Sequence, residues 1–171
     1  MARWNLKSIK MNKIIQLRTA IPEDCWDLLA WRNDPVSIQF SPTGKVEKET
    51  HRRWFNEKLC CENTKIFIIT NEQQDKIGML RFDKSGEESE ISINLNPKFR
   101  GQGYGEQSLR ESLRTYFSNF PVEKVWARIM PTNEASIKVF RQVGFQQDET
   151  YKDTKRMERY LLTREEYAER Y

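Results

Sequence analysis

The segment from Arg100 to Gly105 reads Arg-Gly-Gln-Gly-Tyr-Gly and has a clear potential to bind an anion. It follows an alternating apolar run, Ile91, Ile93 and Leu95, which is typical of a strand, and it leads directly into an amphipathic helical pattern. Backbone N–H groups at a helix N-terminus lack partners, the helix dipole favours negative charge there, and glycines let a ligand approach the main chain closely. The spacing therefore predicts a loop that binds phosphate or pyrophosphate.

Two other glycine motifs that bind phosphate do not fit these residues. A dinucleotide-binding fingerprint needs a third glycine where this chain has Glu106, and a mononucleotide P-loop needs a Gly-Lys-Ser/Thr sequence that the chain lacks. The remaining pattern, Arg-x-x-Gly-x-Gly, resembles the acetyl-CoA pyrophosphate loop of the GCN5-related N-acetyltransferases, the GNAT family. In that family a Q/R-x-x-G-x-G/A signature stands at the end of the fourth strand.

A second segment, about thirty residues further on, strengthens the resemblance. Residues 131–136 read Pro-Thr-Asn-Glu-Ala-Ser, and Gly144 and Phe145 follow at the end of the same helical pattern. In the GNAT family an Asn at the start of this helix faces the pantetheine or the phosphates, and Asn133 is the matching residue. Two motifs in the right order and at the right separation are much more specific than either alone.

The resemblance covers about residues 13–163 and implies an α/β (α+β) fold in one domain. We expect a central mixed, mostly antiparallel sheet of about seven strands flanked by helices, with the fourth and fifth strands splayed so that the pantetheine arm of acetyl-CoA inserts between them. Lys138 or Arg141 is a further candidate for the outer phosphate of the nucleotide, or a solvated helix residue. The residues expected to bind acetyl-CoA are Leu95, Asn96, Arg100, Gly101, Gln102, Gly103, Tyr104, Gly105, Asn133 and Phe140.

The resemblance also implies direct transfer of the acetyl group to an amine. Glu90 is the expected catalytic base, because the family often places a carboxylate near the start of this strand; the alternative is a solvated strand face. Phe140 stands where the family commonly has the Tyr that protonates the leaving thiolate. Either Tyr151 or Tyr160 replaces that acid, or no protein acid is needed, since a thiol with a pKa of about 8.5 leaves readily as its anion.

The acceptor is less clearly indicated. Trp31, Arg32 and Asn33, followed by a His-x-x-Trp-Phe segment with His51 and Trp54, resemble acetyltransferases that act on nucleotide-linked 4-amino-4,6-dideoxy sugars in pseudaminic acid and related pathways. Arginines suit a diphosphate, and tryptophans stack on a base or a sugar. The alternatives are core tryptophans with a helix-capping Asn33, a polyamine or ribosomal-protein/peptide N-acetyltransferase, and a non-catalytic sensor of acyl-CoA.

Composition agrees with one compact enzyme domain over residues 1–171. The chain has 32% charged and 37% hydrophobic residues, and no apolar run approaches the roughly 20 residues that cross a bilayer. Residues 1–7 lack the features of a secretory signal, so we expect a cytoplasmic protein that contacts no membrane. The closing hairpin and the terminal segment offer a contact for a homodimer, a question the sequence leaves open.

Charge and cysteine content exclude other classes. The net charge of +4 is spread along the chain among acidic residues, which does not favour nucleic-acid binding. Cys25, Cys60 and Cys61, with a single His, have neither a disulfide nor a metal-ligand pattern, so we expect reduced thiols and no metal. The five tryptophans are expected mostly in the core or in pocket walls.

Apolar periodicity and turn residues predict the order of elements. Pro22 begins the first helix, which Asp34 and Pro35 end, and Thr163 with Glu166 resembles a capping box for a last helix. Strands are expected at 14–18, 65–70, 77–82, 90–95, 122–130 and in a hairpin of 145–151 with 156–162, and helices at 22–33, 48–61, from the glycine loop to 120, and at 132–143.

Overall fold

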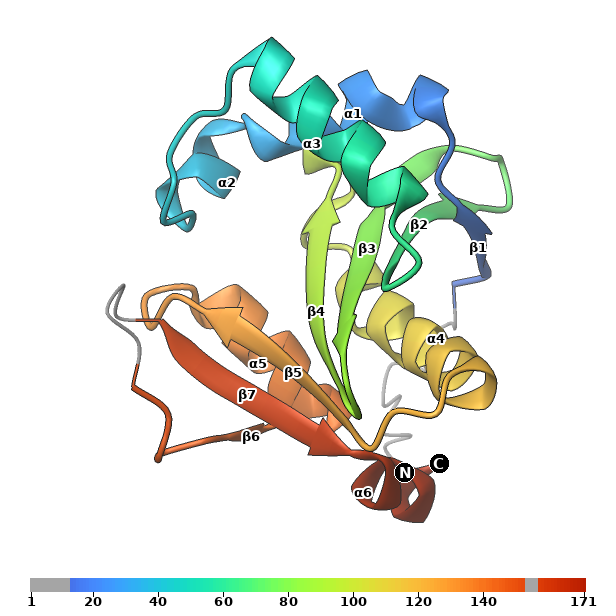
Figure 1. Cartoon of the computed structure of the whole chain (residues 1–171), viewed down its shortest axis with the longest axis vertical. Coiled ribbons are helices and arrows are strands. Elements are labelled where there is room, and N and C mark those ends of the chain that lie inside the picture. Colours follow the sequence, from blue (N-terminus) through green and yellow to red (C-terminus); the bar gives the residue numbers. More distant parts are fainter. Residues whose placement is uncertain (1–12, 153–156) are drawn as a thin grey trace, which may run out of the picture.

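The computed structural model describes residues 13–152 and 157–171 (Figure 1). The strands are β1 (Ile15–Thr19), β2 (Thr64–Asn71), β3 (Lys76–Ser85), β4 (Glu88–Leu95), β5 (Lys124–Ile129), β6 (Gln146–Gln147) and β7 (Glu158–Thr163). The α-helices are α1 (Cys25–Arg32), α2 (Pro35–Gln39), α3 (Lys48–Cys60), α4 (Tyr104–Asn119), α5 (Glu134–Val143) and α6 (Arg164–Arg170), and 3-10 helices span Pro22–Asp24 and Pro97–Phe99.

Within the described residues, seven strands form one sheet in the order β1-β2-β3-β4-β5-β7-β6. Neighbouring strands run antiparallel except β4 and β5, which run parallel. The predicted α/β fold, with a mixed and mostly antiparallel sheet flanked by helices, is confirmed.

β4 and β5 are paired at one end only. Their ladder joins residues 88–90 of β4 to 124–126 of β5, whereas β5 continues beside β7 as far as Ile129 and β4 continues beside β3 as far as Leu95. The two strands therefore separate after Glu90, as Figure 1 shows, and the predicted splay is confirmed.

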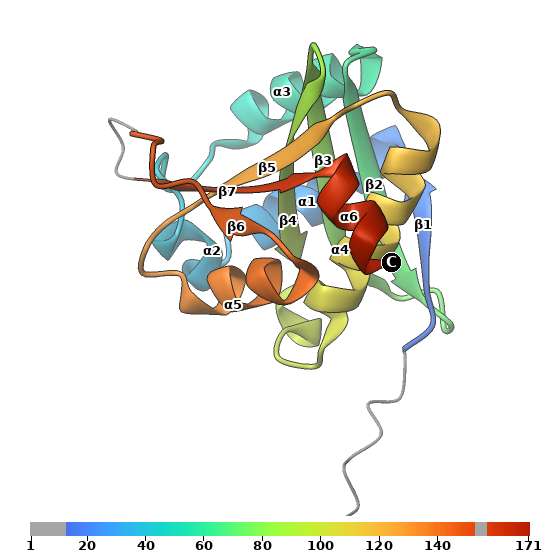
Figure 2. The same ribbon diagram turned by 90° about the horizontal axis from the view of Figure 1, so that it is seen from below.

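Two buried clusters cover the two faces of the sheet, because successive side chains of a strand point to opposite faces. On β2, Ile69 belongs to the larger cluster with α4 and α5, and its neighbour Ile68 belongs to the smaller cluster with α1 and α3. Figure 2 shows the helices divided in this way, with α1 and α3 behind the sheet and α4 and α5 in front. The splay lies between these two layers, so groups from both can reach it.

The N-terminal half contains one helix that the periodicity did not predict. Asp34 and Pro35 end the first helix as expected, but they also begin α2, where the Asp34 side chain accepts hydrogen bonds from the backbone N–H groups of Val36 and Ser37. Pro at the first helical position and Asp at the N-cap are both start signals. With five residues and none of them buried, α2 is too short to show an apolar stripe.

The remaining differences are small. The hairpin is confirmed as β6 paired with β7, but β6 has only two residues. Trp26 is 50% exposed and is an exception to the prediction that the tryptophans lie mostly in the core or in pocket walls. Three features of the sequence analysis lie outside the described residues: Trp4, residues 1–7, and the predicted start of a strand at Arg156. Across the described part of the chain, no helix has the length and apolar character needed to span a membrane.

Candidate functional site

The glycine loop forms the start of α4 at the end of β4. Gly103 is the N-cap of α4 with a φ of +85°, and Gly101 has a φ of +71°, both in the left-handed region that favours glycine. Side chains cap the first turns of α2, α5 and α6, whereas the N-cap glycine of α4 has no side chain to offer. Like α1 and α3, the 16-residue α4 has no side-chain cap on its first N–H groups, and such groups can bind an anion.

Gly105 brings this loop close to the splay. A Cβ on Gly105 would lie 3.5 Å from Val139 of α5 and 3.7 Å from Leu95 at the end of β4. Tyr104 turns its ring into the core, 8% exposed and edge-on to Phe99, so only its backbone belongs to the loop. The Gln102 side chain donates to the Lys98 carbonyl. The loop, β4 and α5 meet at one corner of the sheet.

Arg100 makes contacts different from those expected. Its Nη1 lies 2.5 Å from Asp34 Oδ2, its Nη2 donates to Ser37 Oγ at 2.9 Å, and its Nε donates to the Leu95 carbonyl at 3.2 Å. The hydrogen bond from Arg100 is the main reason that the pKa of Asp34 lies below its ordinary value. The Arg100 charge is therefore compensated by α2, which differs from the expected role of adding charge beside the pyrophosphate.

The free edge of β4 is defined by its hydrogen bonds to β3. The Asn96 backbone N–H donates to the Ile77 carbonyl, and the Asn96 side chain is bonded to the carbonyl of Lys76 and the N–H of Lys98. In an antiparallel pair the bonding direction alternates along the strand, so the backbone groups of Leu95 face away from β3. Leu95 therefore faces the splay, while the backbone N–H of Asn96 is already used.

The second motif lies at the start of α5 as expected. Asn133 Oδ1 accepts from the Ser136 backbone N–H at 3.2 Å and so caps α5. Phe140 is 2% exposed and packs edge-on against Phe145, with ring centroids 4.9 Å apart. Gly144 ends the helix with a φ of +116°. The sequence motif is therefore a capped helix whose Phe140 is a core residue.

Glu90, the candidate base, is held by a partner that the sequence did not reveal. Arg128 of β5 donates from Nε to Glu90 Oε1 at 3.0 Å and from Nη2 to Oε2 at 3.1 Å. The Glu90 side chain is 20% exposed and that of Arg128 is 40% exposed. Both carboxylate oxygens are engaged, so Arg128 holds the Glu90 side chain against β5.

The same face of β5 and β7 carries a cluster of cations and an aromatic ring. Trp126 stands opposite Glu90 in the ladder, and the guanidinium carbons of Arg128 and Arg159 each lie 5.8 Å from the centroid of its ring. Arg159 is also paired with Asp148, donating from Nε at 2.9 Å. The period-two alternation of residues 124, 126 and 128 in the predicted strand was the signal that could have found this face.

The side chains of the Trp-Arg-Asn segment pack against and hydrogen-bond to other residues of the protein. Trp31 is 6% exposed in the smaller core cluster. Asn33 makes two hydrogen bonds of 2.8 Å with the backbone of Val46, and Arg32 Nη2 donates to Ser41 and Thr43. The Arg32 Nη1 atom is buried without a hydrogen-bond partner among the described residues. Arg32 and Asn33 thus shape the loop that joins α2 to α3.

His51 and Trp54 lie on one side of α3 but in different surroundings. His51 is 4% exposed and its Nε2 lies 2.9 Å from the Cys25 carbonyl oxygen. Burial lowers the pKa of His51, with a further contribution from Arg32, against the effect of the Cys25 bond. The neutral ring donates to that carbonyl. His51 therefore joins α3 to α1. Trp54 is half-buried, and the guanidinium carbon of Arg81 lies 5.3 Å from the centroid of its ring.

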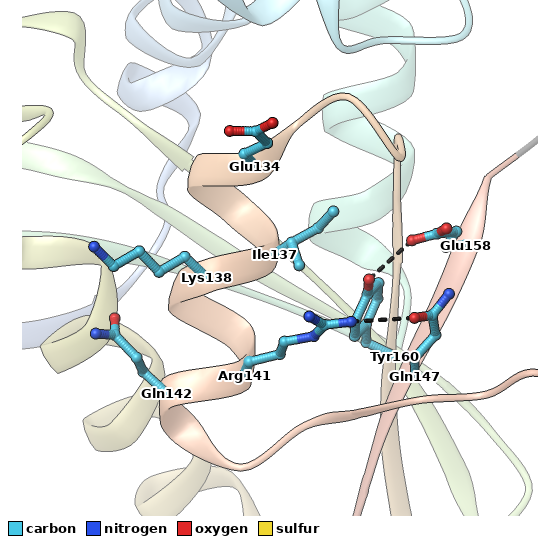
Figure 3. Close-up of a pocket in the computed structure, with 8 residues that line it drawn as sticks. All are labelled: Glu134, Ile137, Lys138, Arg141, Gln142, Gln147, Glu158 and Tyr160. Atoms are coloured by element: carbon cyan, nitrogen blue, oxygen red, sulfur yellow. Dashed lines mark hydrogen bonds between the residues drawn. The ribbon is translucent and has the colours of Figure 1, made fainter.

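A separate groove of about 790 Å³ lies between α5 and strands β6 and β7, as Figure 3 shows. Lys138 and Arg141 line it, and Arg141 donates to Gln147 Oε1 at 3.1 Å. Tyr160 also lines it and donates its hydroxyl proton to Glu158 at 2.8 Å. Burial and the Glu158 carboxylate raise the pKa of Tyr160. All eight residues that line this groove come from α5, β6 and β7, so it is distinct from the glycine loop.

The described residues contain no group of three His, Cys, Asp or Glu side chains placed to hold a metal ion. Cys25 is buried at the start of α1, and Cys60 and Cys61 are exposed; all three are free thiols.

Comparisons with known proteins agree with this geometry. Residues 15–146 match the family model described as the acetyltransferase (GNAT) domain. An uncharacterized protein, MJ1062, of Methanocaldococcus jannaschii is 27% identical over 83% of this chain, which spans 30% of that protein's length. The acetyltransferase PseH of Campylobacter jejuni is 26% identical over 69% of this chain and 74% of its own. A crystal structure of the spermidine N-acetyltransferase of Vibrio cholerae shares the fold, with a TM-score of 0.79 at 14% identity over 90% of this chain and 98% of its own.

Proposed function

The chain belongs to the acetyltransferase (GNAT) domain family, and from this membership we propose that it moves an acetyl group from acetyl-CoA to the primary amine of a nucleotide-linked amino sugar. Acetyl-CoA supplies an activated thioester. The chain supplies the binding groups, the orientation and a base.

One observation carries the proposal: the open N-terminus of α4 lies at the end of β4, where β4 and β5 separate. A long ligand with a phosphorylated part and an amide-containing arm fits this arrangement. The backbone of residues 101–105 binds its pyrophosphate, and the N–H of Leu95, whose carbonyl already accepts from Arg100 Nε, donates to its pantetheine arm. Asn133 and Phe140 border the arm from α5.

The proposed acceptor lies on the face of the sheet opposite α4 and α5. Arg81, Arg128 and Arg159 are cationic, and Trp54 and Trp126 present aromatic rings among them. Guanidinium groups bind phosphate oxygens in pairs, and indole rings stack on bases and sugars. The resemblance of the Trp31-Arg32-Asn33 and His51-to-Phe55 segments to sugar-nucleotide acetyltransferases supports the same class of acceptor.

Glu90 is the proposed base. The acceptor enters as an ammonium ion and loses one proton to Glu90, either directly or through water. Its neutral nitrogen then forms the C–N bond to the acetyl carbonyl as the C–S bond breaks, and the second proton passes to the sulfur. Phe140 has no hydroxyl and packs in the core, so this second proton reaches the CoA thiolate through solvent.

Mass spectrometry of acetyl transfer tests this function. The protein is given acetyl-CoA and a pool of nucleotide-linked 4-amino sugars, spermidine and peptides, with Glu90→Gln as the control. An acetylated sugar nucleotide supports the proposal. Acetylated spermidine or peptide keeps the chemistry but refutes the acceptor, and unchanged amines beside bound acetyl-CoA favour a sensor.

A further inference from the structure

We propose that Arg128 recognises an anionic group of the acceptor and, by turning to it, releases Glu90 to act as the base. The inference rests on the proposed function and adds a condition to it. An amine that carries a phosphate or diphosphate switches the base on, and an amine without an anionic group leaves it engaged.

The geometry of the pair supports this exchange. Arg128 holds both oxygens of Glu90 through Nε and Nη2, at 3.0 and 3.1 Å. The same edge of the guanidinium can donate to two oxygens of a phosphate. A phosphate bound there replaces the carboxylate, because one edge cannot bind two such groups in the same geometry.

The position of the pair connects it to the reaction. Glu90 is the last residue of β4 in the ladder with β5, and Arg128 lies two residues beyond Trp126, its ladder partner. The ion pair thus spans the two strands where they begin to separate. A side chain released there can reach the splay into which the thioester is delivered.

The surroundings favour a second negative charge. Arg159 lies beside the same Trp126 ring as Arg128, with both guanidinium carbons 5.8 Å from the centroid. Among the described residues, Asp148 pairs with Arg159 and Glu90 pairs with Arg128. A diphosphate near these guanidinium groups adds negative charge that Arg128 can neutralise once it leaves Glu90.

Kinetics with two acceptors test the inference. One acceptor is a nucleotide-linked 4-amino sugar, and the other is the same amino sugar as a methyl glycoside, which has no phosphate. In the unmodified protein, kcat for the nucleotide-linked sugar exceeds that for the glycoside. In Arg128→Gln the glycoside gains kcat by about tenfold because Glu90 is released, and the nucleotide-linked sugar loses affinity by about tenfold. In Glu90→Gln both kcat values are low.

Lys124→Gln is the matched control. Lys124 pairs with Glu88 at 3.5 Å across the same two strands, at the closed end of the ladder. Its removal takes one positive charge from the same face without touching Glu90, and the ratio of the two kcat values stays unchanged. If Arg128→Gln lowers kcat for both acceptors, Arg128 has only a structural role and the inference is overturned.

A binding experiment separates this inference from the proposed function. UDP is titrated into the full chain as a probe for a diphosphate, with the fluorescence of the tryptophans as the signal. Arg128→Gln weakens UDP binding by about tenfold and Lys124→Gln does not. Equal affinity in all three proteins, or no binding to the unmodified protein, overturns the inference. If neither sugar is acetylated, the proposed function fails and the UDP result still decides the role of Arg128.

Discussion

Arg100 Nη1 lies 2.5 Å from Asp34 Oδ2, so the first residue of the glycine loop is paired with the residue that begins α2. Arg100 also donates to Ser37 Oγ in α2 and to the Leu95 carbonyl in β4. The proposed cofactor loop and the helices above the opposite face of the sheet are therefore joined by one side chain.

Replacing Asp34 separates its two roles. Asp34→Ala removes both the N-cap of α2 and the partner of Arg100, and we expect the free energy of unfolding to fall by about 1–3 kcal/mol. Asp34→Asn keeps a capping oxygen but removes the charge, so its loss is smaller. Urea denaturation of both variants measures the difference. If both variants lose the same free energy of unfolding, the capping oxygen of Asp34 contributes nothing beyond the ion pair with Arg100.

Gly103→Ala tests the glycine loop. Alanine at a φ of +85° is strained by about 1–2 kcal/mol, and the loop must change shape to relieve this strain. We expect acetyl-CoA binding to weaken about tenfold or more in isothermal titration calorimetry.

Gly86→Ala is the control for Gly103→Ala. Gly86 has a φ of +60° in the turn between β3 and β4, so the substitution causes similar strain away from the loop. Gly86→Ala should lower stability and leave acetyl-CoA affinity unchanged. If the two variants bind acetyl-CoA alike, the conformation of the loop is not what binds the ligand.

We expect Asp24 to make the free energy of unfolding depend on pH in the acidic range. Burial by itself would raise the pKa of Asp24, but hydrogen bonds from Arg18, the Ile21 backbone and Lys76 outweigh burial and hold the pKa well below its ordinary value. A carboxyl whose pKa is lowered by folding stabilises the protein above its unfolded pKa of about 3.9, and this contribution is lost as the pH falls below that value.

Asp24→Asn tests this pH dependence. The variant should be less stable than the parent at pH 7, because Arg18 and Lys76 lose a charged partner, and its stability should fall less steeply between about pH 4 and pH 2. Thermal unfolding across that range measures both effects. Parallel pH profiles for the two proteins would assign the acid sensitivity to other carboxyl groups.

Tyr160→Phe should leave catalysis intact. The Tyr160 hydroxyl is bonded to Glu158 in the groove between α5 and β7, and its ring is 1% exposed. We expect kcat to stay within about twofold of the parent, well below the 10²–10⁴ effect of a general acid, with a modest loss of stability. Steady-state kinetics at neutral pH measures kcat. A loss of a hundredfold would identify Tyr160 as the acid and refute departure of the thiolate without one.

Local patterns were sufficient to predict most of the fold. The strand ending at Leu95, the glycine loop and the 16-residue α4 follow from alternation, glycines and helical periodicity within one stretch of chain. The capping box of Thr163 and Glu166 was equally local and is confirmed. The helix α2 was missed although its signals, Asp34 and Pro35, were present, because five residues are too few to show periodicity.

The sequence by itself determined the family motifs and the order of the elements, because these depend on residues close together in the chain. Only the tertiary structure decided what the side chains touch. Glu90 meets Arg128 across 38 positions, Arg100 meets Asp34 across 66, and His51 is buried against the Cys25 carbonyl. Such pairs form because sheet register and helix packing bring distant segments together, and a charged or polar side chain then takes the partner that compensates it.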